Sequence, residues 1–252
     1  MKRIATIGLS ILVFGSMFSQ KKSDAKIKEA EKPQNKNTSN FKTKGYNLQF
    51  NLSNCNDTMV FLAKYTFDKQ YIVDTCKKVK NGKVYFKSNK DIEKGVYFLV
   101  SQDKVRYFDF FINESNKFAI GGDIKEIRTF KVTGSKENEK FFEYIKYIAT
   151  KNEMFNKLKD KAQQMPKKDS AEFMQREVKQ LNEDVKKFQK DFYEANKGSF
   201  LADVINLQIS KEPENIPLAS NGRPDSIYVY HYIKTHYWDG VNFKDDRLLV
   251  TP

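Results

Sequence analysis

Apolar and polar residues alternate with a two-residue period in the first half of the chain, from Gly45 to about Phe130. Such alternation is typical of strands in a sheet with one buried face. The clearest case is YNLQFNL, with Tyr46, Leu48, Phe50 and Leu52 on one face and Asn47, Gln49 and Asn51 on the other. The pattern predicts further strands at residues 58–66, 70–75, 83–87, 96–101, 106–112 and 117–120.

Turn-forming residues separate these segments, among them Asn81-Gly82, Lys94-Gly95 and Gly121-Gly122. Glycine and asparagine tolerate the backbone angles that tight turns require. Several short strands joined by tight turns, without a helical period between them, predict an antiparallel β-sandwich or open barrel.

After Gly134 the hydrophobic period becomes that of a helix. Ser135 is placed to cap a first helix that ends near Met165-Pro166, and a second is predicted from Ser170 to about Asn196. Two long helices joined by a short turn are expected to pack as an antiparallel hairpin.

A shorter helix is predicted to begin at Ser199, and residues 211–224 are expected to be irregular because they contain three prolines and a glycine. Asp225 or Ser226 is placed to cap a last helix. The predicted fold class is therefore α+β, with an antiparallel β domain over residues 45–131 and a helical domain, a hairpin or bundle, over residues 132–252.

The first twenty residues have the pattern of a cleavable signal peptide: Lys2 and Arg3, then an apolar run from Ile4 to Phe14, then small and polar residues. This run is too short for a good membrane span. Residues 21–44 hold eight lysines against three acidic residues and are predicted to be a disordered basic tether. We therefore expect a periplasmic or otherwise extracytoplasmic protein without an integral membrane span after signal removal.

The formal net charge of +13 raises the question of an anionic partner. Export makes nucleic acid an unexpected partner, and most lysines outside the tether are dispersed over predicted helix faces. We interpret them mainly as solvated surface. The alternative is contact of the tether with anionic lipid head groups or cell-envelope polymers.

Cys55 and Cys76 are the two cysteines of the chain. They do not form the C-x-x-C motif of a dithiol redox centre, in which a helix end lowers the pKa of one thiol. A structural disulfide is possible in an oxidising compartment. However, a turn at Asp68-Lys69 places Cys76 opposite roughly Phe61, far along the strand from Cys55. We favour two separate thiols and keep the Cys55–Cys76 disulfide as the alternative.

The remaining candidates have simpler structural interpretations. His231 and His236 are five positions apart on a predicted helix, so their rings diverge, and two ligands are too few for a metal site. Asp245 and Asp246 lie beside Lys244 and Arg247 and are interpreted as a solvated loop rather than an acid/base pair. The aromatic stretch YVYHYIKTHYW is interpreted as core with a wet rim, and a ligand groove near Trp238 is the alternative. No catalytic, cofactor-binding or metal-binding residue is predicted.

Several stretches resemble the N-terminal region of envelope thioredoxin-like thiol-disulfide oxidoreductases, which consists of two domains of unknown function ahead of the catalytic module. The similar stretches span residues 45–252: DTMVFLAKYTFDKQYIVDT, NGKVYFKSNKDIEKGVYFLV, YFDFFINESNKFAI, GSKENEKFFEYI, FLADVINLQISKEPENIP and YHYIKTHYWDGVNFKDDRLLVTP. Cys55 and Cys76 do not match the redox centre of that family, so the resemblance transfers no site residue and no cofactor.

The resemblance implies a truncated or stand-alone copy of a non-catalytic region. The favoured hypothesis is an exported binding or scaffold module that holds a thioredoxin-like domain or another envelope protein. The alternative is a fragment of a disulfide reductase whose activity lies in a missing C-terminal thioredoxin-like domain.

Overall fold

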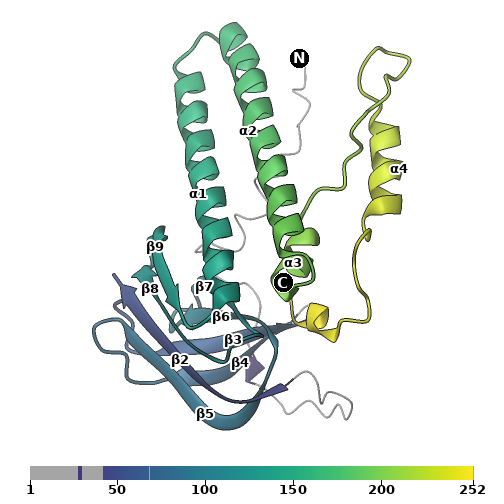
Figure 1. Ribbon diagram of the computed structural model, residues 1–252. Helices are drawn as coiled ribbons and strands as arrows, with labels where there is room; N and C mark the ends of the chain where they lie inside the picture. The colour runs from purple at the N-terminus through teal and green to yellow at the C-terminus, as the bar shows by residue number, and fades with distance from the viewer. Residues whose placement is uncertain (1–27, 30–41, 68, 252) are drawn as a thin grey trace.

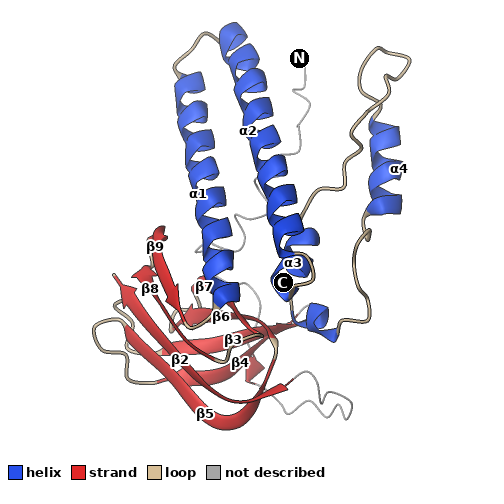
Figure 2. Ribbon diagram, in the orientation of Figure 1, coloured by secondary structure: helices blue, strands red, loops and turns tan. Residues whose placement is uncertain are grey.

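The computed structural model describes residues 28–29, 42–67 and 69–251 (Figure 1). Strands make up the first part of the chain and helices the second, which confirms the predicted α+β class (Figure 2). The predicted signal peptide, residues 1–20, lies outside the described residues. Two described parts of the predicted tether are strands, β1 (Lys28–Glu29) and the start of β2 (Lys42–Ser53), so the tether prediction is wrong for them.

The strands form two sheets. The first sheet has the order β1-β4-β3-β6-β7, and the second has the order β5-β2-β8-β9. The remaining strands are β3 (Val60–Thr66), β4 (Lys69–Cys76), β5 (Lys83–Glu93), β6 (Gly95–Ser101), β7 (Arg106–Ile112), β8 (Lys117–Asp123) and β9 (Glu126–Thr133).

The sheets differ from the prediction in two respects. They are not closed into a barrel, and they are not purely antiparallel, because β2 pairs with β8 in parallel and β1 pairs with β4 in parallel. Strand β9 was not predicted as a strand because its sequence, EIRTFKVT, alternates only weakly. The parallel β2–β8 pair joins segments that are separated by five other strands. The prediction assumed that strands next to each other in sequence pair as antiparallel hairpins, so it did not include this pair.

The core lies between the two sheets, as the alternation in β2 predicts. Leu48 and Phe50 are completely buried, and the Phe50 ring lies 5.2 Å from the ring of Phe110 on the opposite sheet. Each such side chain contributes roughly 1.5–3 kcal/mol by leaving water. Phe108 continues this layer toward the helices, with its ring 5.8 Å from that of Phe142.

The two long helices, α1 (Lys136–Gln163) and α2 (Lys167–Asn196), pack on each other as the predicted hairpin. The Ser135 side chain caps α1, as predicted, by accepting a hydrogen bond from the Asn138 N–H. Helix α1 covers β9 and β7 at the edge where the two sheets meet, so the hairpin projects from the end of the sandwich (Figure 1). Helix α2 begins at Lys167, directly after Pro166 and three residues before the predicted start.

The C-terminal part consists of short elements. Helices α3 (Phe200–Asn206) and α4 (Ser226–His236) begin after Ser199 and Asp225, whose side chains cap them as predicted. A 3-10 helix, η4 (Asp246–Val250), packs on β3 and β6. Helix α4 stands apart from the hairpin on extended connections (Figure 1). None of the helices in the described ranges is both long and apolar enough to cross a bilayer.

Candidate functional site

The two cysteines lie in different places and both are free. Cys76 ends β4 opposite Val60, one position from the predicted partner, and Cys55 follows β2. The Cys55 sulfur lies 3.6 Å from the Tyr107 hydroxyl and 4.0 Å from Asp57, and the Tyr107 hydroxyl donates to Asp57. Burial raises the pKa of the Cys55 thiol, so little of the reactive thiolate forms near neutral pH.

The two histidines lie on α4 without converging. The His236 ring stacks on Tyr232 at 4.0 Å, and its Nδ1 lies 2.8 Å from the Tyr232 carbonyl oxygen, to which it donates. His231 is exposed and contacts the edge of the Tyr230 ring. Within residues 28–29, 42–67 and 69–251, no three His, Cys, Asp or Glu side chains gather in a way that holds a metal ion.

The two neighbouring acids near the C-terminus have different environments. Asp246 is exposed, as the solvated-loop interpretation requires, but the Asp245 side chain is only 11% exposed, so that interpretation is wrong for it. Arg247 donates through Nε and Nη2 to Asp245 at 2.9 and 2.5 Å. Burial favours the neutral acid, yet the bonds from Arg247 outweigh it and the pKa of Asp245 is lowered. Asp245 is thus an ionised anchor and not a proton donor.

The aromatic stretch at the C-terminus is also not the core that its sequence predicts. No residue of α4 is buried, and Trp238 is 54% exposed. The error has a physical cause: aromatic residues occur on several sides of α4, and a single helix cannot turn all of them toward one core. The exposed large apolar residues of the C-terminal part are Ile216, Leu218, Ile227, Tyr228, Tyr230, Tyr237, Trp238, Phe243 and Leu249.

Part of this exposed surface forms a cavity of about 420 Å³, here called the aromatic groove. Its walls come from three separate parts of the chain: the β3–β4 turn, helix α3 and the C-terminal segment. The side chains are mainly apolar. They belong to Phe67, Val204, Leu207, Gln208, Tyr237, Trp238, Val241, Phe243, Asp245, Leu248, Leu249 and Thr251.

Specific contacts hold the groove in shape. The Phe67 N–H donates to the Leu249 carbonyl at 2.9 Å, which ties the turn to the C-terminal segment. The Trp238 ring meets the Phe243 ring edge to face at 5.4 Å. Arg247, besides holding Asp245, donates to Asn113 at 3.1 Å and lies 4.6 Å from the centre of the Phe200 ring. The groove is therefore built on the packed body, although its aromatic rim faces solvent.

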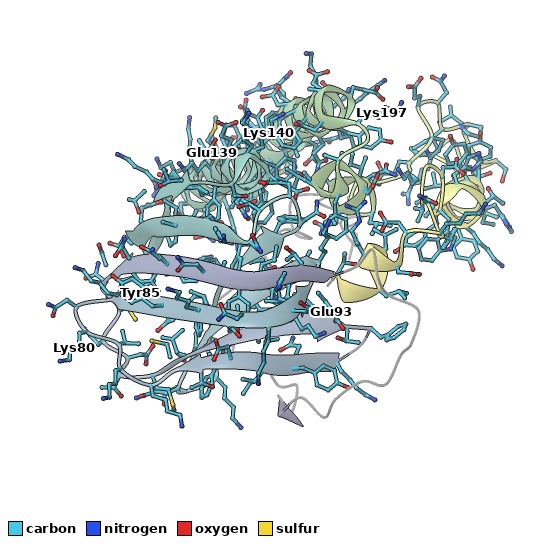
Figure 3. All side chains as sticks on the ribbon, turned by 60° about the horizontal axis from the view of Figure 1, so that its bottom comes forward. Lys80, Tyr85, Glu93, Glu139, Lys140 and Lys197 are labelled. Carbon is cyan, nitrogen blue, oxygen red and sulfur yellow. The ribbon has the colours of Figure 1, made fainter. Side chains whose placement is uncertain are left out.

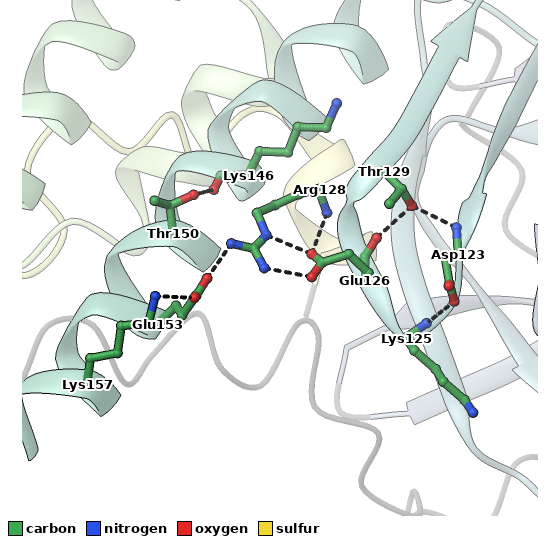
Figure 4. A network of polar contacts seen from close by, with 9 residues as sticks. All are labelled: Asp123, Lys125, Glu126, Arg128, Thr129, Lys146, Thr150, Glu153 and Lys157. Carbon is green, nitrogen blue, oxygen red and sulfur yellow. Dashed lines mark hydrogen bonds and ion pairs between the residues drawn. The ribbon is translucent and has the colours of Figure 1, made fainter. Parts of the chain in front are cut away.

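A second cavity, of about 490 Å³, lies where α1 meets the β8–β9 turn. Arg128 bridges Glu126 on its own strand and Glu153 on α1, and Lys157 donates to Glu153 at 2.7 Å (Figure 4). The hydrogen bonds from Arg128 lower the pKa of Glu126 to about 2. Because these charges satisfy one another, the network fastens α1 to β9 and offers little uncompensated charge to a ligand.

Comparison with known proteins identifies one family. Residues 46–141 match the model of the family described as Domain of unknown function (DUF4369). The matched segment runs from β2 into the second turn of α1 and includes both cysteines. No curated protein and no solved structure matches the chain. The resemblance to a domain of unknown function is thus confirmed for the β part, whereas the match carries no link to thioredoxin-like oxidoreductases.

Neither the groove nor its walls were predicted as a unit. The sequence indicated the neighbourhood of Trp238 only as the less favoured alternative, and Phe67 was not singled out at all. Phe67 has a backbone φ of 54°, which marks the tight β3–β4 turn that presents its side chain to solvent. An aromatic residue directly before the predicted Asp68-Lys69 turn was the sequence indication.

Proposed function

We propose that this protein is a non-catalytic binding module whose aromatic groove docks a folded protein partner. The observation that supports the proposal is the exposure of Trp238, Phe243 and Phe67 around one apolar cavity. Large exposed apolar patches on soluble proteins mark interaction sites, and buried Trp and Tyr side chains supply much of the binding energy in protein interfaces.

The chemistry of the Cys55 thiol supports a non-enzymatic role. Burial raises the pKa of Cys55 and so disfavours its thiolate, and the charge of the Asp57 carboxylate beside it acts in the same direction. A thiol that resists deprotonation is a poor nucleophile for disulfide exchange. An insulin-reduction assay on the full chain tests this part directly: we expect no thiol-dependent turnover, and turnover would refute the assignment.

The partner that the proposal favours is a thioredoxin-like domain outside the cytoplasm. This choice follows from the sequence resemblance, together with the predicted signal peptide. In this arrangement the groove holds the catalytic domain, and the β-sandwich serves as a scaffold. The runner-up, a fragment of a longer disulfide reductase, assigns the same groove to a domain of the same chain.

Titration of a fluorescein-labelled thioredoxin-like domain, taken from an envelope oxidoreductase with a similar N-terminal region, tests the docking surface. We expect the Trp238→Ala variant to bind at least about tenfold more weakly, as for the loss of a central aromatic anchor. Tyr85→Ala is the matched control, because Tyr85 is 51% exposed but lies on the second sheet. Equal affinities of the two variants, or no binding by the unmodified chain, would contradict the proposal.

A further inference from the structure

The outer face of the second sheet carries an ordered pattern of side chains that the aromatic groove does not explain. Strand pairing arranges eleven residues in three rows across the strands, and we call them the basic sheet face. The rows are Lys83, Asn51, Gly121 and Lys131; then Tyr85, Gln49, Ala119 and Thr133; then Lys87, Asn47 and Lys117.

Charge on this face has one sign. Four of the eleven residues are lysines and none is acidic, and all four lysines are exposed. The acids of these strands lie beyond the three rows. Asp91 and Glu93 pair with Lys44 and Lys42, and Asp123 pairs with Glu126. Clustered like charges create a positive potential that attracts an anionic partner.

The shape of the basic sheet face suits an elongated ligand. Strand β8 contributes only Gly121 and Ala119 to the first two rows, so the face is low there, and Lys117 closes this shallow trough at the third row. Lys83 and Lys131 stand on the two sides of this trough, three strand spacings or roughly 14 Å apart. Lys83 and Lys87 are also four positions, or roughly 13 Å, apart along β5. The lysines are therefore spread widely enough to contact several units of a polymer at once, which a small molecule cannot do.

The uncharged side chains favour a hydroxyl-rich ligand. Asn47, Gln49 and Asn51 project from β2 at every second position, roughly 7 Å apart, and each amide both donates and accepts hydrogen bonds. Tyr85, beside Gln49, adds an aromatic ring with a hydroxyl group, and it lies on the open surface of the sheet away from the helices (Figure 3).

We propose that the basic sheet face binds a linear anionic polysaccharide of the polyuronate class. The lysines pair with its carboxylates, and the amide row bonds to its hydroxyl groups. Two other anionic ligands fit less well. Single-stranded nucleic acid requires several aromatic platforms, of which this face has one, and a lipid surface requires apolar side chains that insert between head groups.

The test measures binding of the full chain to polygalacturonate, with neutral dextran as the uncharged comparison. The variant Lys83→Gln/Lys131→Gln removes one lysine from each side of the trough. Its matched control is Lys159→Gln/Lys190→Gln, which removes the same charge from exposed positions on α1 and α2. We expect the first variant to bind at least fivefold more weakly and the control to stay within twofold.

Three outcomes would overturn the proposal. The first is an equal loss of affinity in both double variants, which would show diffuse attraction to a basic protein. The others are no binding to polygalacturonate and equal binding to dextran. Phosphatidylglycerol vesicles and single-stranded DNA are measured in parallel, and a larger loss for either in the Lys83/Lys131 variant would assign the face to that ligand instead. Tyr85→Ala is a second variant at an exposed position. We expect it to weaken polygalacturonate binding while leaving the melting temperature unchanged, and unchanged binding would also count against the proposal.

Discussion

At the scale of single residues, Asp109 stands out because it is fully buried and charged. Its carboxylate pairs with Arg106, whose guanidinium lies 5.5 Å from the centres of the Tyr65 and Phe98 rings. Burial raises the pKa of Asp109 to about 6, while Arg106 acts in the opposite direction. Burial thus outweighs the ion pair, as is common when both charges must leave water.

This balance predicts how stability depends on pH. Asp109 has a higher pKa in the folded state than in the unfolded chain, so its protonation stabilises the fold below about pH 4, and this contribution disappears as the pH rises through about 6. The difference between the pKa values of Asp109 in the folded and unfolded states corresponds to about 3 kcal/mol in the free energy of unfolding. In Asp109→Asn this contribution is absent. Relative to the unmodified protein, the variant should therefore gain free energy of unfolding between pH 4 and pH 7.

Urea unfolding of both proteins at several pH values measures this difference. Asp160→Asn, at an exposed position on α1, is the control and should follow the unmodified protein at every pH. If the curves of Asp109→Asn and the unmodified protein were parallel, the buried carboxylate would not titrate in this range.

At the scale of elements, the junction between α1 and the sandwich depends on one amide side chain. Asn138 is completely buried; its Oδ1 accepts from the Phe111 N–H at 2.7 Å, and its Nδ2 donates to the Phe111 carbonyl at 2.8 Å. Strand β7 is an edge strand, and the Asn138 amide takes the place of a neighbouring strand by pairing with the N–H and carbonyl of Phe111. These backbone groups would otherwise be buried without partners.

Replacing this side chain should therefore be costly. Asn138→Ala leaves the N–H and carbonyl of Phe111 unpaired, and we expect a loss of about 2–5 kcal/mol in the free energy of unfolding. Chemical denaturation measures the loss, with Asn156→Ala at an exposed position on α1 as the matched control. A loss below about 1 kcal/mol would mean that water replaces the amide at this junction.

Most helices and strands could be predicted from the sequence, because the residues that determine them are close together in the chain. Ser135, Ser199 and Asp225 precede helices and cap them, and the alternation of Leu48 and Phe50 marks the buried face of β2. The contacts between distant parts of the chain could be found only in the structure. The parallel pairing of β2 with β8, the bond between Phe67 and Leu249, and the exposure of α4 depend on segments distant in sequence, which no local period encodes.

At the scale of the whole molecule, the protein presents two separate surfaces around one packed core. The aromatic groove includes the end of the chain, and the basic sheet face lies on the second sheet, whose inner side forms half of the core. The residues that match DUF4369 contain the basic sheet face entirely but contribute only Phe67 to the groove. A function common to proteins with the DUF4369 domain would therefore involve the basic sheet face. Docking through the aromatic groove would instead depend on the C-terminal segment, outside that domain.

The attachment of that segment depends on Arg247, which joins Asp245 to Asn113 and lies on Phe200. Removing it leaves the mostly buried Asp245 without its cation. Hydrogen bonds to charged groups contribute about 1.5–3 kcal/mol each, so we expect Arg247→Ala to open the groove roughly ten- to a hundredfold more often. The Phe67 amide, bonded to Leu249 across the groove, reports this opening through hydrogen exchange.

The expected result is faster exchange at Phe67 while amides of β6, which lies between β3 and β7 in the first sheet, stay protected. Arg223→Ala, in the exposed irregular segment, should change neither. If exchange accelerated equally at Phe67 and β6, Arg247 would stabilise the whole fold and the groove would not open as a separate unit. If neither changed, the C-terminal segment would be held by its apolar contacts alone, and the groove would keep its shape without the ion pair.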